Sequence, residues 1–454
     1  MKDSNISIAI IGGSGFWTEI NHAPNIIYAI KKYPENIKNV YIVDPRNPAN
    51  QENYPNIKKL LKSNKTQYIT PRVNISETVE YLKKIGVDLL IIASDPVSHY
   101  DYILNGLQYG INIICDKPIF NNKNASTSTK AAKQIYKKFE ILCNEYKKQK
   151  SINNRLFCIL LLRRRTLPVF NDIANNLNYI YQETGAGINN ANLVIHNGIF
   201  KHPNEFMITG AHGYTKGIGS LSHSAYHYLD LLIWYIEKAP GNITKISPRL
   251  SNIFRVKDYI ESDLPNILFG IRNGKQILSE SILGSELDVG FYIDLFDSKN
   301  KKCGAIHFAN NHLSVTNRTR KFDINNDNEP ANFIDGGRMS HITIDIHQSG
   351  QQNIQLFKND IALNSSKIVL KIRRNPSIKG ENYIEKEYNN AYKASGNELK
   401  NTFMNIIDSM VNHSNIDENK INDLLDESKT FKLFSEMYEL IAKDFEDKKG
   451  KMYE

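Results

Sequence analysis

The sequence ISIAIIGGSGFWT, residues 6–18, decides the fold of this chain. An apolar run of strand length leads directly into a glycine-rich turn, and helix-like apolar spacing follows through residue 30. Glycines let a backbone turn tightly and approach a pyrophosphate, whose charge then meets the amide groups at the start of the helix. Gly13 and Gly15 fit the first two glycines of a dinucleotide-binding turn, and Thr18 occupies the third position. The predicted cofactor-binding turn consists of Gly13, Ser14, Gly15, Phe16 and Trp17.

A second predicted strand, residues 39–43, ends in Asp44. An acidic side chain at this position can accept the ribose hydroxyls of an adenosine, which favours NAD as the cofactor. Arg46 follows two residues later and could instead hold a 2′-phosphate, so NADP stays open as a second possibility. The alternative interpretation is an ordinary strand-to-helix turn followed by a surface aspartate.

Strands and helices continue to alternate along residues 1–150. Buried strands are predicted at 87–94 and 111–115, and a long amphipathic helix at 126–148 closes this part of the chain. Continuous apolar strands alternating with helices predict a parallel, doubly wound sheet of the Rossmann type, hence an α/β fold. The loop after residue 93 carries Ser94, Asp95, Pro96 and His99, which we expect near the cofactor. His99 has an equally good interpretation as a residue that packs under this loop.

The strand at 111–115 runs into Asp116, Lys117 and Pro118. Open α/β sheets bind their ligands at the carboxyl ends of the strands, which is where this lysine stands. Pro118 fixes its own φ and keeps Lys117 away from helical angles, so the lysine stem has a defined direction. We expect Asp116 and Lys117 to line the cofactor, and Lys117 to act in catalysis. A charged turn that only caps the strand is the alternative interpretation.

Residues 151–454 predict a second domain of the α+β type, with a large, mostly antiparallel open sheet. The segment from about 317 to 395 is a predicted insertion, and amphipathic helices at the C-terminal end are expected to return to the core. The predicted strands lie at 156–162, 190–197, 243–246, 266–271, 276–281, 290–295, 305–308, 313–316, 343–346 and 354–357.

A second informative stretch, GIGSLSHSAYHYLD, covers residues 217–230. His223, His227 and Asp230 are spaced i, i+4 and i+7, which places them on one face of a predicted α-helix. A neutral imidazole can take a proton from a sugar hydroxyl, and a neighbouring carboxylate or second histidine can orient it. A metal site is the second interpretation, because imidazole and carboxylate are zinc ligands. A polar helix start with hydrogen-bonded histidines is the third.

Composition limits the classes of partner. The 454 residues suggest two domains, and the formal charge of +9 comes from 57 Lys and Arg against 48 Asp and Glu that are dispersed along the chain. Only Arg163, Arg164 and Arg165 form a basic cluster, so nucleic-acid binding is not predicted, whereas a small anionic substrate is favoured. Four cysteines without a CxxC pair, no signal peptide and no apolar stretch of membrane-spanning length predict a cytoplasmic protein without a membrane partner.

Together these stretches resemble the glucose-fructose oxidoreductase/inositol dehydrogenase family, Gfo/Idh/MocA. Asp116-Lys117-Pro118 resembles the family's Glu-Lys-Pro signature, and residues 94–99 resemble the loop after its fourth strand. Residues 165–168 are similar to the start of its second domain, and residues 219–230 to its glycine-rich turn followed by Asp-x-Gly-x-His-x-x-Asp. The resemblance implies a Rossmann domain followed by an α/β domain whose open sheet forms homodimers or homotetramers.

The resemblance also implies a reaction. It is hydride transfer between C4 of NAD(P) and a carbon that bears a secondary hydroxyl, on a sugar, cyclitol or nucleotide sugar. Lys117 would hydrogen-bond the reacting oxygen and His227 would be the acid/base group, with Arg165, His223 and Asp230 beside the substrate and no metal. His223 stands where the family usually has Asp, which leaves the proton relay open. A non-catalytic NAD(P)-binding sensor or regulatory protein and an NAD-dependent glycosidase are the alternatives.

Overall fold

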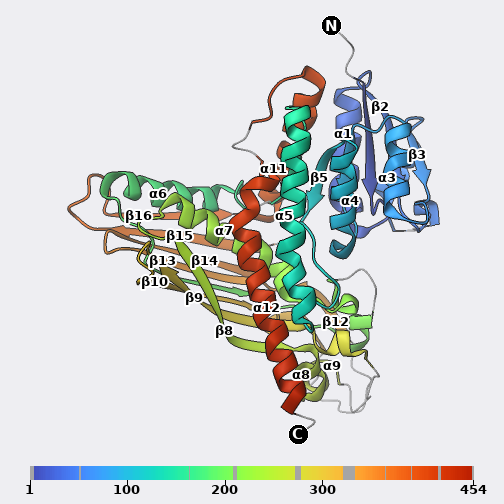
Figure 1. Cartoon of the computed structure of the whole chain (residues 1–454). Coiled ribbons are helices and arrows are strands. Elements are labelled where there is room, and N and C mark those ends of the chain that lie inside the picture. Colours follow the sequence, from blue (N-terminus) through green and yellow to red (C-terminus); the bar gives the residue numbers. More distant parts are fainter. Residues whose placement is uncertain are drawn as a thin grey trace. The chain divides into compact units, whose positions relative to one another are not determined.

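The computed structural model divides the chain into two compact units, which are described one at a time (Figure 1). Unit 1 comprises Met1–Asn121, Ile135–Thr166 and Ser395–Ser428, and unit 2 comprises Asn122–Gln134, Leu167–Ala394 and Lys429–Glu454. Each unit therefore takes segments from both sides of residue 150. The structure describes residues 5–50, 53–162, 164–207, 212–270, 278–320, 333–362, 365–389, 391–417 and 421–451.

Unit 1 contains a six-stranded sheet in the order β3-β2-β1-β4-β5-β6. Every neighbouring pair is parallel, which confirms the predicted doubly wound Rossmann sheet. The strand order reverses between β1 and β4, and a ligand binds at the carboxyl ends of the strands beside such a reversal. The strands are β1 (Ile6–Ile11), β2 (Ile37–Val43), β3 (Thr66–Ile69), β4 (Leu89–Ile92), β5 (Asn112–Asp116) and β6 (Cys158–Leu161).

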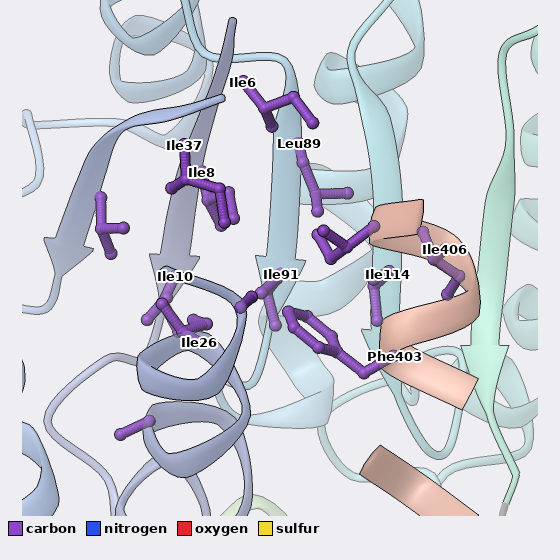
Figure 2. Close-up of a cluster of buried hydrophobic side chains, with 14 of the residues drawn as sticks. Ile6, Ile8, Ile10, Ile26, Ile37, Leu89, Ile91, Ile114, Phe403 and Ile406 are labelled. Carbon is purple, nitrogen blue, oxygen red and sulfur yellow. The ribbon is translucent and has the colours of Figure 1, made fainter. Parts of the chain in front are cut away.

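Helices on unit 1 bury an isoleucine-rich core against this sheet. Figure 2 shows Ile10 and Ile91 from two strands, Ile26 from α1, and Phe403 and Ile406 from α11 in one cluster. All five side chains are almost fully buried, and each contributes about 1.5–3 kcal/mol by its removal from water. The helices are α1 (Ala23–Lys32), α2 (Pro55–Leu61), α3 (Ile75–Lys84), α4 (Pro96–Gln108), and parts of α5 (Thr129–Ile152) and α11 (Ala391–Asn412).

Unit 2 contains an eight-stranded sheet in the order β16-β15-β14-β13-β7-β10-β9-β8. All its pairs are antiparallel except β7 with β10, which confirms the predicted, mostly antiparallel open sheet. β13 to β16 come from the segment predicted as an insertion, so that segment supplies half of the sheet. The strands are β7 (Asn190–His196), β8 (Lys245–Arg255), β9 (Glu286–Phe296), β10 (Lys302–Asn311), β13 (His341–Gln348), β14 (Gln352–Ala362), β15 (Ser365–Arg374) and β16 (Tyr383–Asn389), beside a hairpin of β11 (Thr316–Arg320) and β12 (Phe333–Arg338).

Helices α6 (Pro168–Thr184) and α7 (Tyr226–Lys238) lie over one face of this sheet (Figure 1). Alternate strand residues such as Leu193 and Leu356 are buried, whereas Tyr292 on the opposite face is 49% exposed. Among the described helices, none is both long enough and apolar enough to span a bilayer. The remaining helices of this unit are α8 (Val256–Glu261), α9 (Leu264–Phe269), α10 (Glu280–Leu283) and most of α12 (Ser428–Lys451).

The predicted strand at 266–271 is wrong over residues 266–269, which form the end of α9, and residue 271 lies outside the described residues. Pro265 lies in the first turn of α9, where the missing amide hydrogen has no cost, and Gly270 ends it with a φ of 68°. The predicted strand at 276–281 begins outside the described residues, and its last residues form the start of α10. A short apolar run between turns fits a strand and a helix equally well, which explains the error.

Candidate active site

The turn after β1 is built around Gly12. Its φ is +78°, and a Cβ atom there would lie 2.7 Å from the carbonyl oxygen of Ala93. The Gly12 amide donates to the carbonyl of Val43 at 2.9 Å, which fastens the turn to the end of β2. The space between Gly12 and Ala93, the residue after β4, therefore admits no side chain at position 12. The sequence predicts Gly13 as the first glycine of the fingerprint, and the structure shows that Gly12 makes the tight turn before it.

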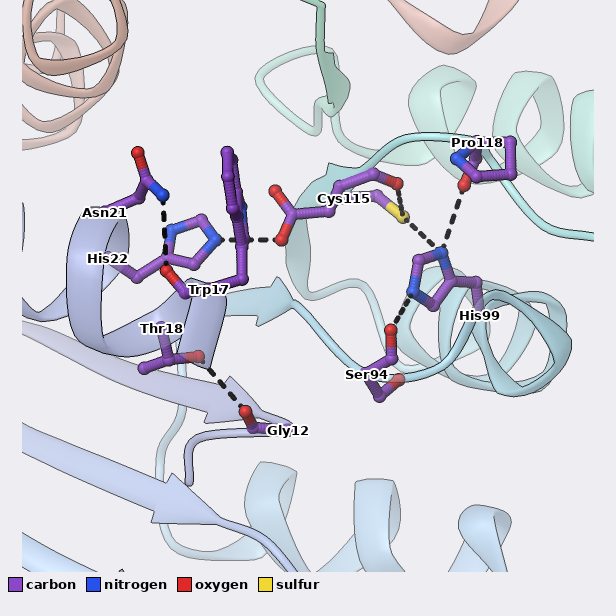
Figure 3. A network of polar contacts seen from close by, with 10 residues as sticks. Gly12, Trp17, Thr18, Asn21, His22, Ser94, His99, Cys115 and Pro118 are labelled. Carbon is purple, nitrogen blue, oxygen red and sulfur yellow. Dashed lines mark hydrogen bonds and ion pairs between the residues drawn. The ribbon is translucent and has the colours of Figure 1, made fainter. Parts of the chain in front are cut away.

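Thr18 takes the place of the third glycine in a way that the turn can accommodate. Its hydroxyl donates to the carbonyl oxygen of Gly12 at 3.0 Å, and the side chain is fully buried (Figure 3). Thr18 also begins η1 (Thr18–His22), a π-helical turn that leads into α1. The hydroxyl thus closes the turn from inside. In contrast, Phe16 is 63% exposed, and its predicted contact with the cofactor stays a prediction.

Asp44 links the glycine turn to the end of β2. One carboxylate oxygen accepts the amide of Ser14 at 3.1 Å, and the other accepts the amide of Arg46 at 2.9 Å. The Arg46 guanidinium lies 3.3 Å from the same oxygen and remains 62% exposed. The Asp44 carboxylate, which could accept ribose hydroxyls, is therefore in direct contact with the Arg46 guanidinium, which could bind a 2′-phosphate.

A dinucleotide fits this part of unit 1. The side-chain-free turn at Gly12 leaves backbone for a pyrophosphate to approach, and Asp44 provides an acceptor at the end of the next strand. The backbone of residues 13–17 would hold the pyrophosphate, and Asp44 or Arg46 the ribose end.

The loop that carries Lys117 is fastened to the start of α1. The Asp116 carboxylate lies 3.0 Å from Nε2 of His22, a buried residue of η1, as the dashed line from His22 shows in Figure 3. Lys117 is half-buried directly after β5, and its bond to Pro118 is cis. Hence Lys117 follows a residue that is fixed to the helix after the glycine turn.

His99 connects the loops that follow β4 and β5. Its Nε2 lies 2.9 Å from the carbonyl oxygen of Ser94, and its Nδ1 lies 3.1 Å from that of Pro118 (Figure 3). The imidazole is almost fully buried, a position that agrees with the packing interpretation of this residue. Asp95 caps α4 through the amide of Val97 at 3.0 Å, and Pro96 occupies the first turn of that helix.

In unit 2 the predicted histidine helix has an irregular start. His223 lies in η5 (Leu221–Ala225), a π-helical turn, and His227 and Asp230 lie in α7. Because a π-turn bonds residue i to i+5, it changes the regular α-helical spacing from which a single face was predicted. His227 and Asp230 are buried, whereas His223 is half-buried.

Both ring nitrogens of His223 meet hydroxyl groups. Nε2 lies 3.3 Å from the hydroxyl of Tyr214, and Nδ1 lies 2.8 Å from that of Ser224. The exposed His212 ring stacks on the His223 ring, with 4.1 Å between the centroids. The same two hydroxyls lie 3.1 and 3.2 Å from the nitrogens of His312, which follows β10. Tyr214, Ser224 and His312 were not predicted, because they belong to segments that only the folded sheet brings together.

Glu286 holds the chain just before these histidines. It is fully buried, and one carboxylate oxygen accepts the amides of Gly219 and Leu221 at 3.1 and 3.2 Å. Hydroxyls of Ser126 and Tyr438 donate to the same carboxylate at 2.5 and 3.0 Å. Position 219 must be glycine, because a Cβ atom there would lie 2.0 Å from the carbonyl oxygen of Glu286. Burial raises the pKa of Glu286, and the donated hydrogen bonds oppose that shift.

Asp288 yields a prediction for the pH dependence of stability. Its Oδ1 accepts the amides of His312 and Leu313 at 2.6 and 3.1 Å, and burial raises its pKa to about 6. The folded chain then binds a proton more tightly than the unfolded chain. Stability from this group is fully present below about pH 4 and is lost as the pH rises through about 6. For this group alone we expect a loss of up to about 3 kcal/mol.

Asp288→Asn is the matched variant, because an amide oxygen can accept both amide hydrogens without a charge. Urea unfolding at about pH 4 and about pH 7 should show a smaller fall in the free energy of unfolding for the variant than for the wild type. Equal falls in the two proteins would contradict the assignment.

Two arginines of the basic cluster, Arg165 and Arg163, have different outcomes in the structure. Arg165 is paired with the buried carboxylate of Glu427 at 3.4 Å, within unit 1. Its predicted contact with substrate stays a prediction, and Arg163 lies outside the described residues. Within the described ranges, no group of three or more His, Cys, Asp or Glu side chains is arranged to hold a metal ion.

Comparison with known protein families gives a match for the N-terminal part of the chain. Residues 6–141 match the family model GFO_IDH_MocA, the oxidoreductase family with an NAD-binding Rossmann fold. This part of the chain belongs to the Gfo/Idh/MocA family. The predicted family and NAD as the cofactor are thereby confirmed, whereas NADP stays a prediction. No curated protein sequence matches the chain.

Solved structures share the fold over nearly the whole length. A levoglucosan dehydrogenase in complex with NADH and levoglucosan is 12% identical, with a TM-score of 0.54 over 97% of this chain and 98% of that one. An NAD-binding oxidoreductase from Klebsiella pneumoniae is 11% identical, with a TM-score of 0.55 over 97% and 98%. A super-repressor mutant of Gal80p from Saccharomyces cerevisiae is 14% identical, with a TM-score of 0.56 over 96% of each chain. At these identities the likeness to the three solved structures shows the fold alone.

Proposed function

We propose that this Gfo/Idh/MocA chain is an NAD(P)-dependent dehydrogenase or reductase that acts on a secondary hydroxyl or ketone of a sugar, cyclitol or nucleotide sugar. The observation that carries the proposal is the placement of Lys117. It follows β5, the neighbour of β4 at the strand-order reversal, and Asp116 before it is paired with His22 of η1, which follows the glycine turn. A lysine held at the ligand-binding end of an NAD-binding sheet is suited to polarise a reacting oxygen.

The proposed roles of the side chains follow from their chemistry. When bound, NAD accepts or supplies hydride at nicotinamide C4. Lys117 donates a hydrogen bond to the oxygen of the reacting carbon, and its charge stabilises the developing alkoxide. The imidazole of His227 takes the hydroxyl proton in the oxidative direction and returns it in the reductive direction.

A dinucleotide-binding regulator is the second candidate. A super-repressor mutant of Gal80p shares this fold over 96% of each chain, so the fold by itself is compatible with a regulatory role. The observation that favours this candidate is the engagement of both His223 nitrogens with hydroxyls, where the family usually has a carboxylate.

The deciding experiment combines binding and turnover. Purified protein is titrated with NADH and NADPH by fluorescence, and then incubated with NAD or NADP and a panel of sugars, sugar acids, cyclitols and nucleotide sugars. Dehydrogenase activity predicts reduced nicotinamide absorbance with at least one substrate class. Tight binding of the cofactor without turnover on any class would favour the regulator, and absence of cofactor binding would overturn both.

Asp44 and Arg46 are expected to set the cofactor preference. Asp44→Asn should weaken NADH binding by about tenfold, because a hydrogen bond to a charged group contributes about 1.5–3 kcal/mol. Arg46→Ala should weaken NADPH binding more than NADH binding, because only NADPH carries the 2′-phosphate. Fluorescence titration measures both ratios. Arg155→Ala is the matched control, since Arg155 is an exposed residue outside the turn. Unchanged ratios in both variants would contradict the assignment.

We also propose a homodimer or homotetramer that forms through the open face of the eight-stranded sheet. This face exposes Tyr292 on β9 and Phe357 on β14, with exposed fractions of 49% and 37%. Removal of such side chains from water is a favourable term in association. Light scattering should give a mass of two or four chains, and Tyr292→Asp should lower it. A monomeric wild type would overturn this proposal.

A further inference from the structure

Four side chains of unit 2 form a closed ring of hydrogen-bond contacts. The Tyr214 hydroxyl lies 3.3 Å from Nε2 of His223 and 3.1 Å from Nδ1 of His312. The Ser224 hydroxyl lies 2.8 Å from Nδ1 of His223 and 3.2 Å from Nε2 of His312. Each hydroxyl thus bridges the two imidazoles, and each imidazole bridges the two hydroxyls. His312 is able to join because it follows β10, a strand that contacts the π-turn that carries His223.

The number of hydrogens suits this ring when both histidines are neutral. A hydroxyl supplies one hydrogen and can accept another, and a neutral imidazole does the same with its two nitrogens. Two hydroxyls and two neutral imidazoles therefore provide one hydrogen for each of the four contacts. All hydrogens must point the same way around the ring, so the tautomer of His223 determines that of His312.

An additional proton disturbs this arrangement. An imidazolium donates from both nitrogens, so one hydroxyl must accept twice and turn its own hydrogen out of the ring. Tyr214 and His312 are 1% and 0% exposed, and Ser224 is also buried. A displaced hydroxyl hydrogen in such a place costs about 1–3 kcal/mol if it finds no acceptor. The ring therefore favours the neutral form of both histidines.

The charged groups around the ring act in both directions. Burial raises the pKa of Tyr214, and the carboxylates of Glu286 and Asp288 raise it further and would attract a positive charge. However, burial raises the pKa of Asp288 to about 6, so its charge fades in the pH range in which a histidine gains a proton. Asp288 accepts the backbone amide of His312. The His212 imidazole, which stacks on the His223 imidazole, would repel a positive charge on His223 when it is itself charged.

We propose that Tyr214, Ser224 and His312 are positioning residues that hold His223 as a neutral imidazole, with its tautomer coupled to that of His312. In the proposed dehydrogenase reaction, on which this inference about His223 rests, His223 then exchanges no proton with the substrate. The acid/base role belongs to His227 alone. Unit 2 therefore presents a neutral group at the position where a carboxylate would supply a fixed negative charge, which suits a substrate that carries an anionic group nearby.

The test reads the protons directly. Protein labelled with nitrogen-15 in histidine and saturated with NAD is followed by long-range proton–nitrogen NMR from about pH 8 to about pH 5.5, and His223→Asn and His312→Asn assign the signals. At about pH 5.5 an ordinary histidine is doubly protonated in roughly nine molecules of ten. We expect His223 and His312 to remain neutral in the wild type, each with one fixed tautomer. Tyr214→Phe removes two of the ring contacts, and should raise the doubly protonated fraction of one of them by about tenfold.

Tyr259→Phe is the matched control. Tyr259 packs on Phe206 as Tyr214 does, but its hydroxyl donates to the carbonyl of Lys201 and touches no ring member in the described structure. Its substitution should leave both histidine signals unchanged. If Tyr214→Phe does not fold, Ser224→Ala opens the ring from the other side. Ordinary titration of His223 in the wild type, or unaltered tautomers in both ring variants, would overturn the proposal. Failure of the dehydrogenase assignment would leave these spectra readable, so the two results are separable.

Discussion

Lys117→Ala is expected to lower turnover by about a thousandfold or more while NAD binding stays within about threefold of the wild type. The ammonium group is proposed to meet the oxygen that becomes negative in the transition state, so its loss acts on the chemical step. The residues that fit the cofactor, around Gly12 and Asp44, are untouched by this change. Steady-state kinetics with the substrate class found by the panel, together with NADH fluorescence titration, measure the two effects separately.

Two variants serve as controls for this result. Lys123→Ala removes an exposed lysine six residues further along and should retain full activity. Lys117→Arg keeps the positive charge but changes its shape and donor geometry, so only part of the activity should return. Full turnover by Lys117→Ala would exclude the catalytic role of this lysine, and loss of NAD binding in that variant would reassign it to the cofactor.

Glu286→Ala is expected to lower the free energy of unfolding by about 3–5 kcal/mol. The buried carboxylate accepts two backbone amides and two hydroxyls, and alanine would leave these four donors without their acceptor. The amides belong to Gly219 and Leu221, so the π-turn that carries His223 should lose its fixed start as well. Urea unfolding followed by circular dichroism measures the stability loss.

Glu261→Ala provides the comparison, because Glu261 is 65% exposed on α8 and its contact with Lys257 is 4.0 Å long. An exposed pair of this kind contributes little, so its removal should change stability by less than about 0.5 kcal/mol. A similarly small effect of Glu286→Ala would show that the four hydrogen bonds to the Glu286 carboxylate do not limit the stability of unit 2.

The parallel sheet of unit 1 could be predicted because its signals are local. Each strand is a short, continuous apolar run that ends in a turn, and such strands alternate with helices of ordinary length. The same kind of apolar run led to a wrong strand prediction at residues 266–269. These residues form a helix that has Pro265 in its first turn and Gly270 at its end. The pairing of β13 to β16 with the rest of the sheet had no local signal, so half of that sheet was predicted as an insertion.

The candidate site divides along the same line. Asp44, Asp116, Lys117 and the histidines at 223 and 227 stand next to recognisable turns and strand ends, and each could be proposed from a motif. The partners that complete the site are remote in sequence. His312 is 98 residues from Tyr214 and 88 from Ser224, and Glu286 is 160 residues from Ser126. His312 follows β10, which contacts the π-turn η5, so long-range packing brings it to Tyr214 and Ser224.

The π-turn before α7 has a consequence for sequence alignment. A π-turn contains one residue more than an α-turn, and a homologue with a regular helix here would lack one residue between Ser220 and Tyr226. Such a deletion rotates the preceding residues by about 100° around the helix axis. The equivalence of His223 to the aspartate of other family members thus depends on where a single gap is placed. With the gap between His223 and His227, Ser222 becomes the counterpart of this aspartate, whereas a gap before His223 leaves the histidine aligned with it.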